Sequence, residues 1–249
     1  MSVLVVVPTV GPVPTKHKLF KQLQGDSHVS EVLVVDNGNC FNLKNHPHLK
    51  KFNEIDAGCN LNWLASCNLG MSVALTRSFE YVCLLNDDVT LSRQCFSGLL
   101  TAAKVNKDVG SVMPLYNSKS VIKAYDAASE KDWKPVQEDF PCVSVDGTCL
   151  LIPVRVIKDI GFLDPVFFGP GWGAEIDYRL RMDDNELKNY ITRRSKVWHE
   201  TRSVSASKLY GSEDNYVKKA ATWARQGFRQ KYGENWRVDL DLLKAFIEK

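Results

Sequence analysis

The amino-acid sequence predicts an α/β fold with a mostly parallel central sheet flanked by helices. Three short apolar runs, at residues 3–7, 32–35 and 81–85, show no polar alternation. Such runs are typical of strands that are buried on both faces, as in parallel sheets. Segments with helical periodicity lie between them, and a chain of 249 residues that is 44% hydrophobic is long enough to bury a sheet of this kind.

The elements follow in a strand-helix alternation over the first half of the chain, which is typical of α/β sheets. A helix at 15–24 carries Leu19, Phe20 and Leu23 on one face. The remaining expected elements of this half are a helix at 61–78, a helix around 92–104 and a strand at 110–115. Residues 116–140 are more polar and predict a surface excursion, after which order returns at 142–152. A final amphipathic helix is expected at 213–231, packed on the body of the protein.

Composition excludes several classes of protein. Lys and Arg (32) exceed Asp and Glu (29) by only three, so the chain carries no strong nucleic-acid signal. No apolar run approaches the roughly 20 residues of a membrane span, and no signal-peptide pattern is present. We therefore expect a soluble, cytoplasmic protein. The seven cysteines are scattered without a C-x-x-C motif, which favours free thiols over a disulfide framework or a zinc ribbon.

Polar residues directly follow each of the three apolar runs. In an open parallel sheet, ligands bind at the carboxyl ends of the strands, so these residues predict a binding rim. They are Pro8, Thr9, Asp36, Asn37, Gly38, Asn86, Asp87 and Asp88.

The glycine-rich phosphate loops of dinucleotide-binding and P-loop proteins are absent from the sequence. If the rim binds a nucleoside diphosphate, another group must neutralise the phosphates. Asp87 and Asp88 are candidates, because carboxylates bind Mg²⁺ or Mn²⁺ and the metal then binds the phosphates. A turn or helix N-terminus is the alternative for this pair, since Thr90 and Ser92 follow.

Several motifs, in this order, resemble those of the GT-A glycosyltransferases, particularly family 2, which includes rhamnosyl-, galactosyl- and glucosyltransferases. The resemblance covers roughly residues 3–200 and rests on the following segments: Val6-Val7-Pro8-Thr9, Val34-Val35-Asp36-Asn37-Gly38-Asn39, Gly58-Cys59-Asn60-Leu61-Asn62, Leu84-Leu85-Asn86-Asp87-Asp88, Asp146-Gly147-Thr148, Ile160-Gly161-Phe162-Leu163-Asp164, Phe167-Phe168-Gly169-Pro170-Gly171-Trp172-Gly173-Ala174-Glu175-Ile176-Asp177-Tyr178-Arg179-Leu180-Arg181 and Trp198-His199-Glu200.

The resemblance implies a role for each matching residue. It implies that Asp88 is the chief ligand of a divalent metal, Mn²⁺ or Mg²⁺, and that His199 completes the metal or diphosphate site. Glu175 is implied to be the general base, with Asp177 supporting it in the catalytic group. The residues implied to bind the nucleotide sugar are Pro8, Thr9, Asp36, Asn60, Asn86, Asp87, Trp172 and Arg181.

Two positions depart from the family pattern, and four residues also have a structural interpretation. Asn86 stands where the DxD-like motif has its first acid, and an amide oxygen carries no charge; Ala174 replaces the first acid of the family's Glu-Asp pair. The structural alternatives are a helix N-terminal acid for Glu175, a buried core histidine for His199, a turn residue for Asp36 and a packing role for Trp172.

The function expected from the resemblance is metal-dependent transfer of a sugar from a nucleotide-diphosphate sugar, with a UDP-sugar favoured, to an acceptor hydroxyl, with inversion. The acceptor is a glycan, a lipid-linked sugar or a protein. The alternatives are a sugar-nucleotide nucleotidyltransferase and a catalytically silent GT-A scaffold that binds a glycan or partner. We expect one GT-A domain over 1–204, with a nucleotide-sugar-binding half (1–115) and an acceptor-side half (116–204). Residues 205–249 are expected to form a helical extension packed on it.

Overall fold

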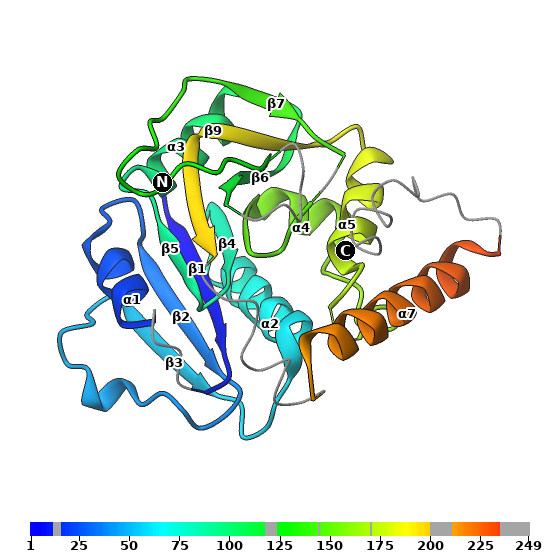
Figure 1. Ribbon diagram of the computed structural model, residues 1–249, viewed down its shortest axis with the longest axis horizontal. Coiled ribbons are helices and arrows are strands. Elements are labelled where there is room, and N and C mark those ends of the chain that lie inside the picture. Colours follow the sequence, from blue (N-terminus) through cyan, green and yellow to red (C-terminus); the bar gives the residue numbers. More distant parts are fainter. Residues whose placement is uncertain (12–15, 118–123, 144, 170, 200–210, 235–249) are drawn as a thin grey trace.

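A computed structural model describes residues 1–11, 16–117, 124–143, 145–169, 171–199 and 211–234. In these residues, nine strands form one sheet with the order β3-β2-β1-β4-β8-β6-β9-β5, and β7 pairs with β9 (Figure 1). The strands are β1 (Val3–Thr9), β2 (Glu31–Asp36), β3 (Phe52–Asp56), β4 (Tyr81–Leu85), β5 (Val89–Leu91), β6 (Val109–Tyr116), β7 (Asp139–Pro141), β8 (Cys149–Pro153) and β9 (Lys188–His199).

The helices pack on this sheet. They are α1 (Lys16–Gly25), the short 3₁₀ helix η1 (Leu43–Asn45), α2 (Asn62–Thr76), α3 (Cys95–Val105), α4 (Val154–Ile160), α5 (Ala174–Asp183) and α7 (Glu213–Tyr232). Helix α2 packs on β1 and β4, whereas α1 contacts β5 and α3 contacts β6 and β9. Among the helices in the described ranges, none has the length and apolar character needed to cross a bilayer.

Strands β3, β2, β1 and β4 are parallel to one another, and the rest of the sheet is mixed. The crossover from β1 leads to β2 on one side, and the crossover from β3 leads back past β1 to β4 on the other side. Because such crossovers are right-handed, α1 and α2 lie on opposite faces. The point between β1 and β4 is therefore the topological switch point at which ligands bind in open sheets.

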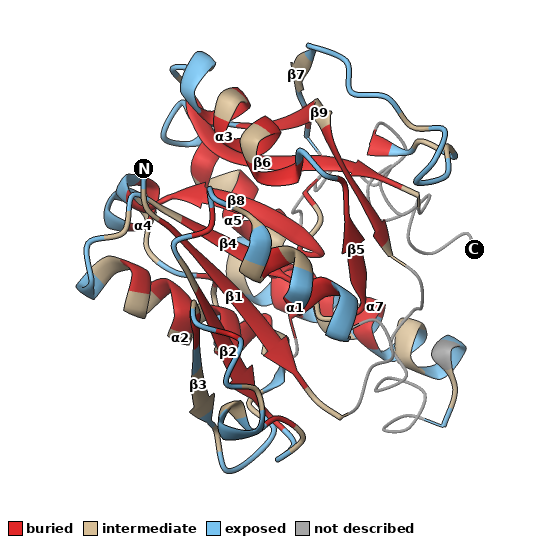
Figure 2. Cartoon of the chain, turned by 90° about the vertical axis from the view of Figure 1, so that its left-hand side faces the viewer, coloured by how far each residue is buried: buried red, intermediate tan, exposed pale blue. Residues whose placement is uncertain are grey.

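The structure confirms the predicted α/β class and the main predicted elements. The apolar runs at 3–7, 32–35 and 81–85 lie within β1, β2 and β4, and the buried strands form the centre of the molecule (Figure 2). The predicted strand at 110–115 lies within β6, and the four predicted helices correspond to α1, α2, α3 and α7. Strands β3, β5, β7 and β9 were not predicted. The first three are short or half-exposed and have no apolar run of their own, and β9 mixes basic with apolar side chains.

The expected surface excursion at 116–140 is a mostly exposed loop over residues 124–138, which leads into β7. The predicted division between residues 115 and 116 falls at the end of β6, inside the single sheet. The predicted boundary between residues 204 and 205 lies outside the described residues, as do residues 235–249 of the expected extension.

Helix α7 packs on the body of the protein, as expected for the C-terminal helix. Its Phe228 is fully buried, and the ring lies 4.7 Å from that of Phe168, centroid to centroid. A Cβ atom at Gly227 would lie 2.3 Å from the carbonyl oxygen of Phe167, so the glycine permits this close approach.

The contact between α2 and β1 is equally tight. All seven residues of β1 are buried, and Gly70 of α2 lies directly on Val6: a Cβ atom at Gly70 would be 2.3 Å from Val6 Cγ2. This approach brings the helix close to the strand whose carboxyl end forms the predicted binding rim.

We predict that Gly70→Ala destabilises the protein by about 1–3 kcal/mol, because the added methyl group overpacks the core against Val6. Gly25→Ala is the matched control. Gly25 ends α1, and a Cβ atom there would meet nothing within 4 Å, so its effect should stay below about 1 kcal/mol. Denaturant unfolding of both variants checks this. Equal stabilities of the two variants would contradict the described packing.

Candidate functional site

The carboxyl ends of β1, β2 and β4 meet, as predicted from the apolar runs. The Thr9 hydroxyl donates a hydrogen bond to Asp87 Oδ2 at 2.5 Å, and the Thr9 carbonyl accepts one from the Asn37 amide at 2.8 Å. Pro8 and Thr9 therefore lie between the residues that follow β2 and those that follow β4. The strand-end residues form one rim at the switch point.

Asp36 anchors the loop that follows β2. Its carboxylate accepts hydrogen bonds from the backbone amides of Gly38, Cys40 and Phe41, at 3.0, 2.8 and 2.8 Å. Burial by itself raises the pKa of Asp36, but these bonds outweigh it and the pKa lies below its usual value. The side chain is almost completely buried, so Asp36 shapes the wall of the rim, and its contact with a nucleotide stays a prediction.

Asn60 lies at the start of α2. Its side-chain oxygen accepts a hydrogen bond from the Asn62 amide at 2.8 Å, and Asn62 has a positive φ of 64°. Asn60 is exposed beside the rim. A contact of Asn60 with the nucleotide sugar is compatible with this position and stays a prediction.

Asp88 and His199 form a buried pair. The pairing of β5 with β9 places Val89 opposite His199, and His199 Nε2 lies 2.9 Å from Asp88 Oδ1. The two side chains are only 9% and 17% exposed. The sequence separates them by more than 100 residues, so the tertiary structure brings together the two residues that were predicted to bind a metal.

A carboxylate and an imidazole are suitable ligands for Mn²⁺. In the part of the chain that the structure describes, no group of three or more His, Cys, Asp or Glu side chains is arranged to hold a metal ion. The donor set of Asp88 and His199 therefore fits a divalent cation that takes its remaining ligands from a bound phosphate group or from water.

Trp63 is a site residue that sequence analysis missed. Its indole nitrogen donates a hydrogen bond to Asn86 Oδ1 at 3.1 Å. The ring lies against two glycines from separate loops: Cβ atoms at Gly147 and Gly171 would lie 2.5 and 3.3 Å from its carbon atoms. Its place in the first turn of the helix after the 58–62 loop was the only signal in the sequence.

The bond from Trp63 determines how Asn86 is oriented. An indole N–H can only donate, so the amide oxygen of Asn86 faces Trp63 and its NH₂ group faces elsewhere. Asn86 can therefore donate a hydrogen bond to a ligand through its NH₂ group, and the bond to Trp63 occupies one of the two lone pairs of its oxygen. Asp88 and His199 are then the stronger candidates for metal ligands at the rim, and metal binding there stays a prediction.

Glu175 is a half-buried acid, one of whose carboxyl oxygens is fully buried and has no hydrogen-bond partner among the described residues. It lies in the first turn of α5, and Oε2 has neither solvent exposure nor a partner among the described residues. Burial raises the pKa of Glu175 to about 8, and the charge of Asp146 adds to this effect. Asp146 adjoins Gly147, which lies on Trp63, so Glu175 lies on the Trp63 side of the rim.

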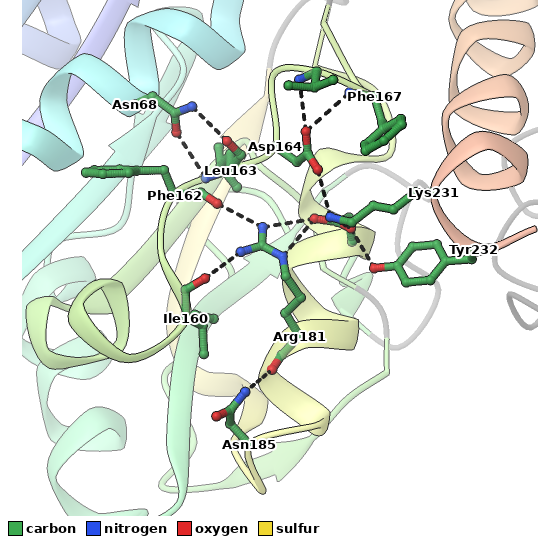
Figure 3. Close-up of polar contacts among 12 residues, drawn as sticks. Asn68, Ile160, Phe162, Leu163, Asp164, Phe167, Arg181, Asn185, Lys231 and Tyr232 are labelled. Atoms are coloured by element: carbon green, nitrogen blue, oxygen red, sulfur yellow. Dashed lines mark hydrogen bonds and ion pairs between the residues drawn. The ribbon is translucent and has the colours of Figure 1, made fainter.

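Asp177 and Arg181 lie in a different cluster, and the cluster members Ile160, Arg181 and Lys231 come from three parts of the chain (Figure 3). The buried carboxylate of Asp177 accepts hydrogen bonds from Arg181 Nε at 2.9 Å and Tyr232 at 2.6 Å, and it forms an ion pair with Lys231 at 2.6 Å. Arg181 also donates to the carbonyl oxygens of Ile160 and Phe162.

This geometry favours a structural role for Asp177 and Arg181, because both side chains are fully engaged in attaching α7 and the 160–164 loop to α5. Trp172 is also engaged with α7: its indole nitrogen donates to the Tyr216 hydroxyl at 2.9 Å. The predicted roles of Asp177 in catalysis and of Arg181 and Trp172 in nucleotide-sugar binding stay predictions that these contacts do not favour.

Comparison with known proteins identifies the fold. No family model matches the chain. Among curated proteins, the low-salt glycan biosynthesis hexosyltransferase Agl10 of Haloferax volcanii is 24% identical over 185 residues, which cover 67% of this chain and 57% of that protein. The chain thus spans little more than half the length of this relative.

Several solved glycosyltransferase structures have the same fold at 13% sequence identity. GalNAc-T7, solved with UDP, GalNAc and Mn²⁺, matches with a TM-score of 0.64 over 100% of this chain and 54% of its own. The mannosyltransferase PcManGT from Pyrobaculum calidifontis, in complex with GDP-Man and Mn²⁺, matches with a TM-score of 0.61 over 99% of this chain and 68% of its own. S. aureus TarS (1–349) matches at 0.55, over 100% and 80%. The chain has the GT-A fold, as predicted.

Glu175 predicts a dependence of stability on pH. Its pKa is higher in the folded protein than in the unfolded chain, so between about pH 4.5 and 8 the folded state retains a proton that the unfolded chain releases. This contribution to stability is fully present below pH 4.5 and is lost as pH rises towards 8, by at most about 1.4 kcal/mol per pH unit. Glu175→Gln should remove this decline, whereas Glu186→Gln, at an exposed acid, should retain it. The free energy of unfolding of both variants, measured at several pH values, checks this. If it changes with pH in the same way in both variants, the burial of the Glu175 carboxyl is contradicted.

Asn86→Asp tests the orientation set by Trp63. The substitution keeps an acceptor for the indole and replaces the NH₂ group with a second, charged oxygen. We expect the variant to bind Mn²⁺ more tightly, on the order of tenfold, because a charged ligand is added at the rim. Titration of Mn²⁺ followed by electron paramagnetic resonance measures this. The double variant Asn86→Asp, Asp88→Asn is the control, and an unchanged Mn²⁺ affinity in Asn86→Asp would show that residue 86 does not face the cation.

Proposed function

We propose that the protein is a metal-dependent glycosyltransferase that transfers a hexose from a nucleoside-diphosphate sugar to an acceptor hydroxyl. The observation that carries this proposal is the placement of two chemically distinct groups at one rim. The Asp88–His199 pair is suited to a cation, and the carboxyl of Glu175, with one buried oxygen that has no partner, lies beyond Trp63. The GT-A fold and the hexosyltransferase relative support the same reaction.

Asp88 and His199 would hold the cation at the carboxyl ends of the strands. A bound divalent cation neutralises the negative charge that develops on a leaving diphosphate. Thr9 orients Asp87 beside it, and the NH₂ group of Asn86 is directed to donate a hydrogen bond to the donor. The two matched glycosyltransferases solved with nucleotides contain UDP and GDP-Man, each with Mn²⁺, which supports a nucleoside diphosphate as the leaving group.

Glu175 would act as the general base. A base works best when its pKa lies near the working pH, and burial raises the pKa of Glu175 to about 8. The acceptor oxygen forms a bond to the anomeric carbon while the bond to the diphosphate breaks, and the acceptor proton moves to Glu175. One such displacement inverts the anomeric carbon. Because deprotonated Glu175 is required, kcat/KM should rise as the pH approaches 8.

The donor and acceptor classes follow the same proposal. We favour a UDP-sugar as donor, and a glycan, lipid-linked sugar or protein hydroxyl as acceptor. The rim residues after β1, β2 and β4 would bind the nucleotide, whereas the half over residues 116–204, which includes α5, would bind the acceptor. Residues 1–204 would thus work as one unit, to which the C-terminal helix is attached through the Asp177 cluster.

Binding and transfer can be separated by two variants. We expect UDP or GDP with Mn²⁺ to raise the melting temperature, by roughly 5–10 °C at 100 times Kd. Asp88→Asn should lose the metal-dependent part of this shift. Glu175→Gln should keep the shift and lose at least about 100-fold in transfer from a nucleotide sugar.

Three results would contradict the proposal. Full transfer activity in Glu175→Gln would show that Glu175 is not the general base. A rise in melting temperature on nucleotide binding that depends on neither Mn²⁺ nor Asp88 would show that no metal takes part in nucleotide binding. A wild-type protein without any nucleotide shift would instead be a catalytically silent GT-A scaffold.

A further inference from the structure

A cavity of about 700 Å³ lies outside the site described above. It is bounded by the end of α1, the residues that follow β5, the 130–135 loop and Trp198 of β9. Side chains alternate between the two faces along a strand, so Trp198 and the adjacent His199 point to opposite faces. The cavity therefore lies behind the β5–β9 pair as seen from Asp88, and none of the predicted site residues lines it.

The walls of this cavity are held in place by side-chain hydrogen bonds. The side-chain amide of Gln22 in α1 binds both the carbonyl and the amide of Leu91, at 2.8 and 3.1 Å, which joins α1 to the edge strand β5. On the other side, the fully buried ammonium group of Lys196 donates to the carbonyls of Asp126 and Ala128 and to the Asp126 carboxylate. The cavity is thus a formed feature of the fold.

The cavity is lined by two acidic side chains, Asp26 and Glu130, and two basic ones, Arg93 and Lys134. Both acidic side chains are engaged: Glu130 pairs with Lys18 at 2.7 Å, and Asp26 accepts a hydrogen bond from the His28 amide at 2.8 Å. Arg93 and Lys134 are exposed, and neither has an acidic partner in the described part of the chain. Two cations therefore remain for a ligand, which favours an anionic one.

The remaining lining is aromatic and polar. Trp133 and Trp198 meet edge to face, with ring centroids 6.1 Å apart, and Trp198 is fixed by a hydrogen bond to the Ala128 carbonyl at 3.0 Å. The polar side chains of Gln94 and Ser97 lie in the same lining. Aromatic faces pack on the C–H faces of sugar rings, while amide and hydroxyl groups bind ring hydroxyls.

We propose that this cavity binds a short acidic oligosaccharide, whose carboxylates pair with Arg93 and Lys134 and whose rings pack on Trp133, which the buried Trp198 supports. The volume lies within the range of about 300–1,000 Å³ of small-molecule sites. The anionic character of the ligand follows from the lining, whereas its identification as a saccharide rests on the proposed function. The site anchors a glycan chain apart from the reacting hydroxyl.

Calorimetric titration of trigalacturonic acid into the full chain, without donor, tests this site. We expect saturable binding, and binding at least tenfold weaker in the double variant Arg93→Gln, Lys134→Gln, because its charge-assisted hydrogen bonds are lost. The matched control is Lys50→Gln, Lys107→Gln, which removes two exposed positive charges away from the cavity and should bind as the wild type does. Maltotriose, a neutral trisaccharide, should bind at least tenfold more weakly than trigalacturonic acid.

Four outcomes would overturn the inference. They are the absence of binding, an equal loss in both double variants, equal affinity for maltotriose, and competition by inorganic phosphate at the affinity of the saccharide. The nucleotide shift with Mn²⁺ separates this site from the proposed function. It should be unchanged in Arg93→Gln, Lys134→Gln. If the protein binds trigalacturonic acid but its melting temperature does not rise with nucleotide and Mn²⁺, this site is supported and the proposed transferase function is contradicted.

Discussion

The parallel pairing of β1 with both β2 and β4 is the constraint on which the rest of this structure depends. All of β1 is buried between its neighbours, and helix α2 approaches it so closely that only glycine fits at position 70. Because the chain crosses from β3 past β1 to β4, the polar ends of β1, β2 and β4 meet at one rim. The contacts of Thr9 with Asp87 and Asn37 are a direct result.

Buried acids in this protein differ in whether their oxygens have partners. The carboxylate of Asp177 binds Arg181, Lys231 and Tyr232, and its partners hold α7 and the 160–164 loop against α5. Glu175, two residues earlier in the same helix, has a buried oxygen without a partner. Leaving a polar group unpaired costs about 1–3 kcal/mol, so such a group is a stronger candidate for chemistry than an acid that is fully engaged.

Trp63 connects the two halves of the site. It contacts Asn86 after β4, Gly147 before β8 and Gly171 before α5. The indole lies between two glycines and separates the Asp88–His199 pair from Glu175. The same contact explains how Asn86 can replace an acid in a DxD-like motif. Its oxygen accepts a hydrogen bond from the indole of Trp63, and its NH₂ group can donate one to a ligand.

The sequence alone was sufficient for the fold class, the order of the central elements and the residues at the rim. Each of these depends on local signals: buried strands appear as unbroken apolar runs such as 3–7 and 81–85, and the ends of parallel strands must share an edge. The sequence also singled out Asp88 and His199. Short or half-exposed strands such as β5 and β7 carry too few apolar side chains to be recognised. Only the tertiary structure decided which acids have partners, because Asp177 pairs with Lys231 and accepts a hydrogen bond from Tyr232, both from a distant helix. It also decided which tryptophan lies at the rim, because Trp63 is positioned by glycines about 85 and 110 residues away.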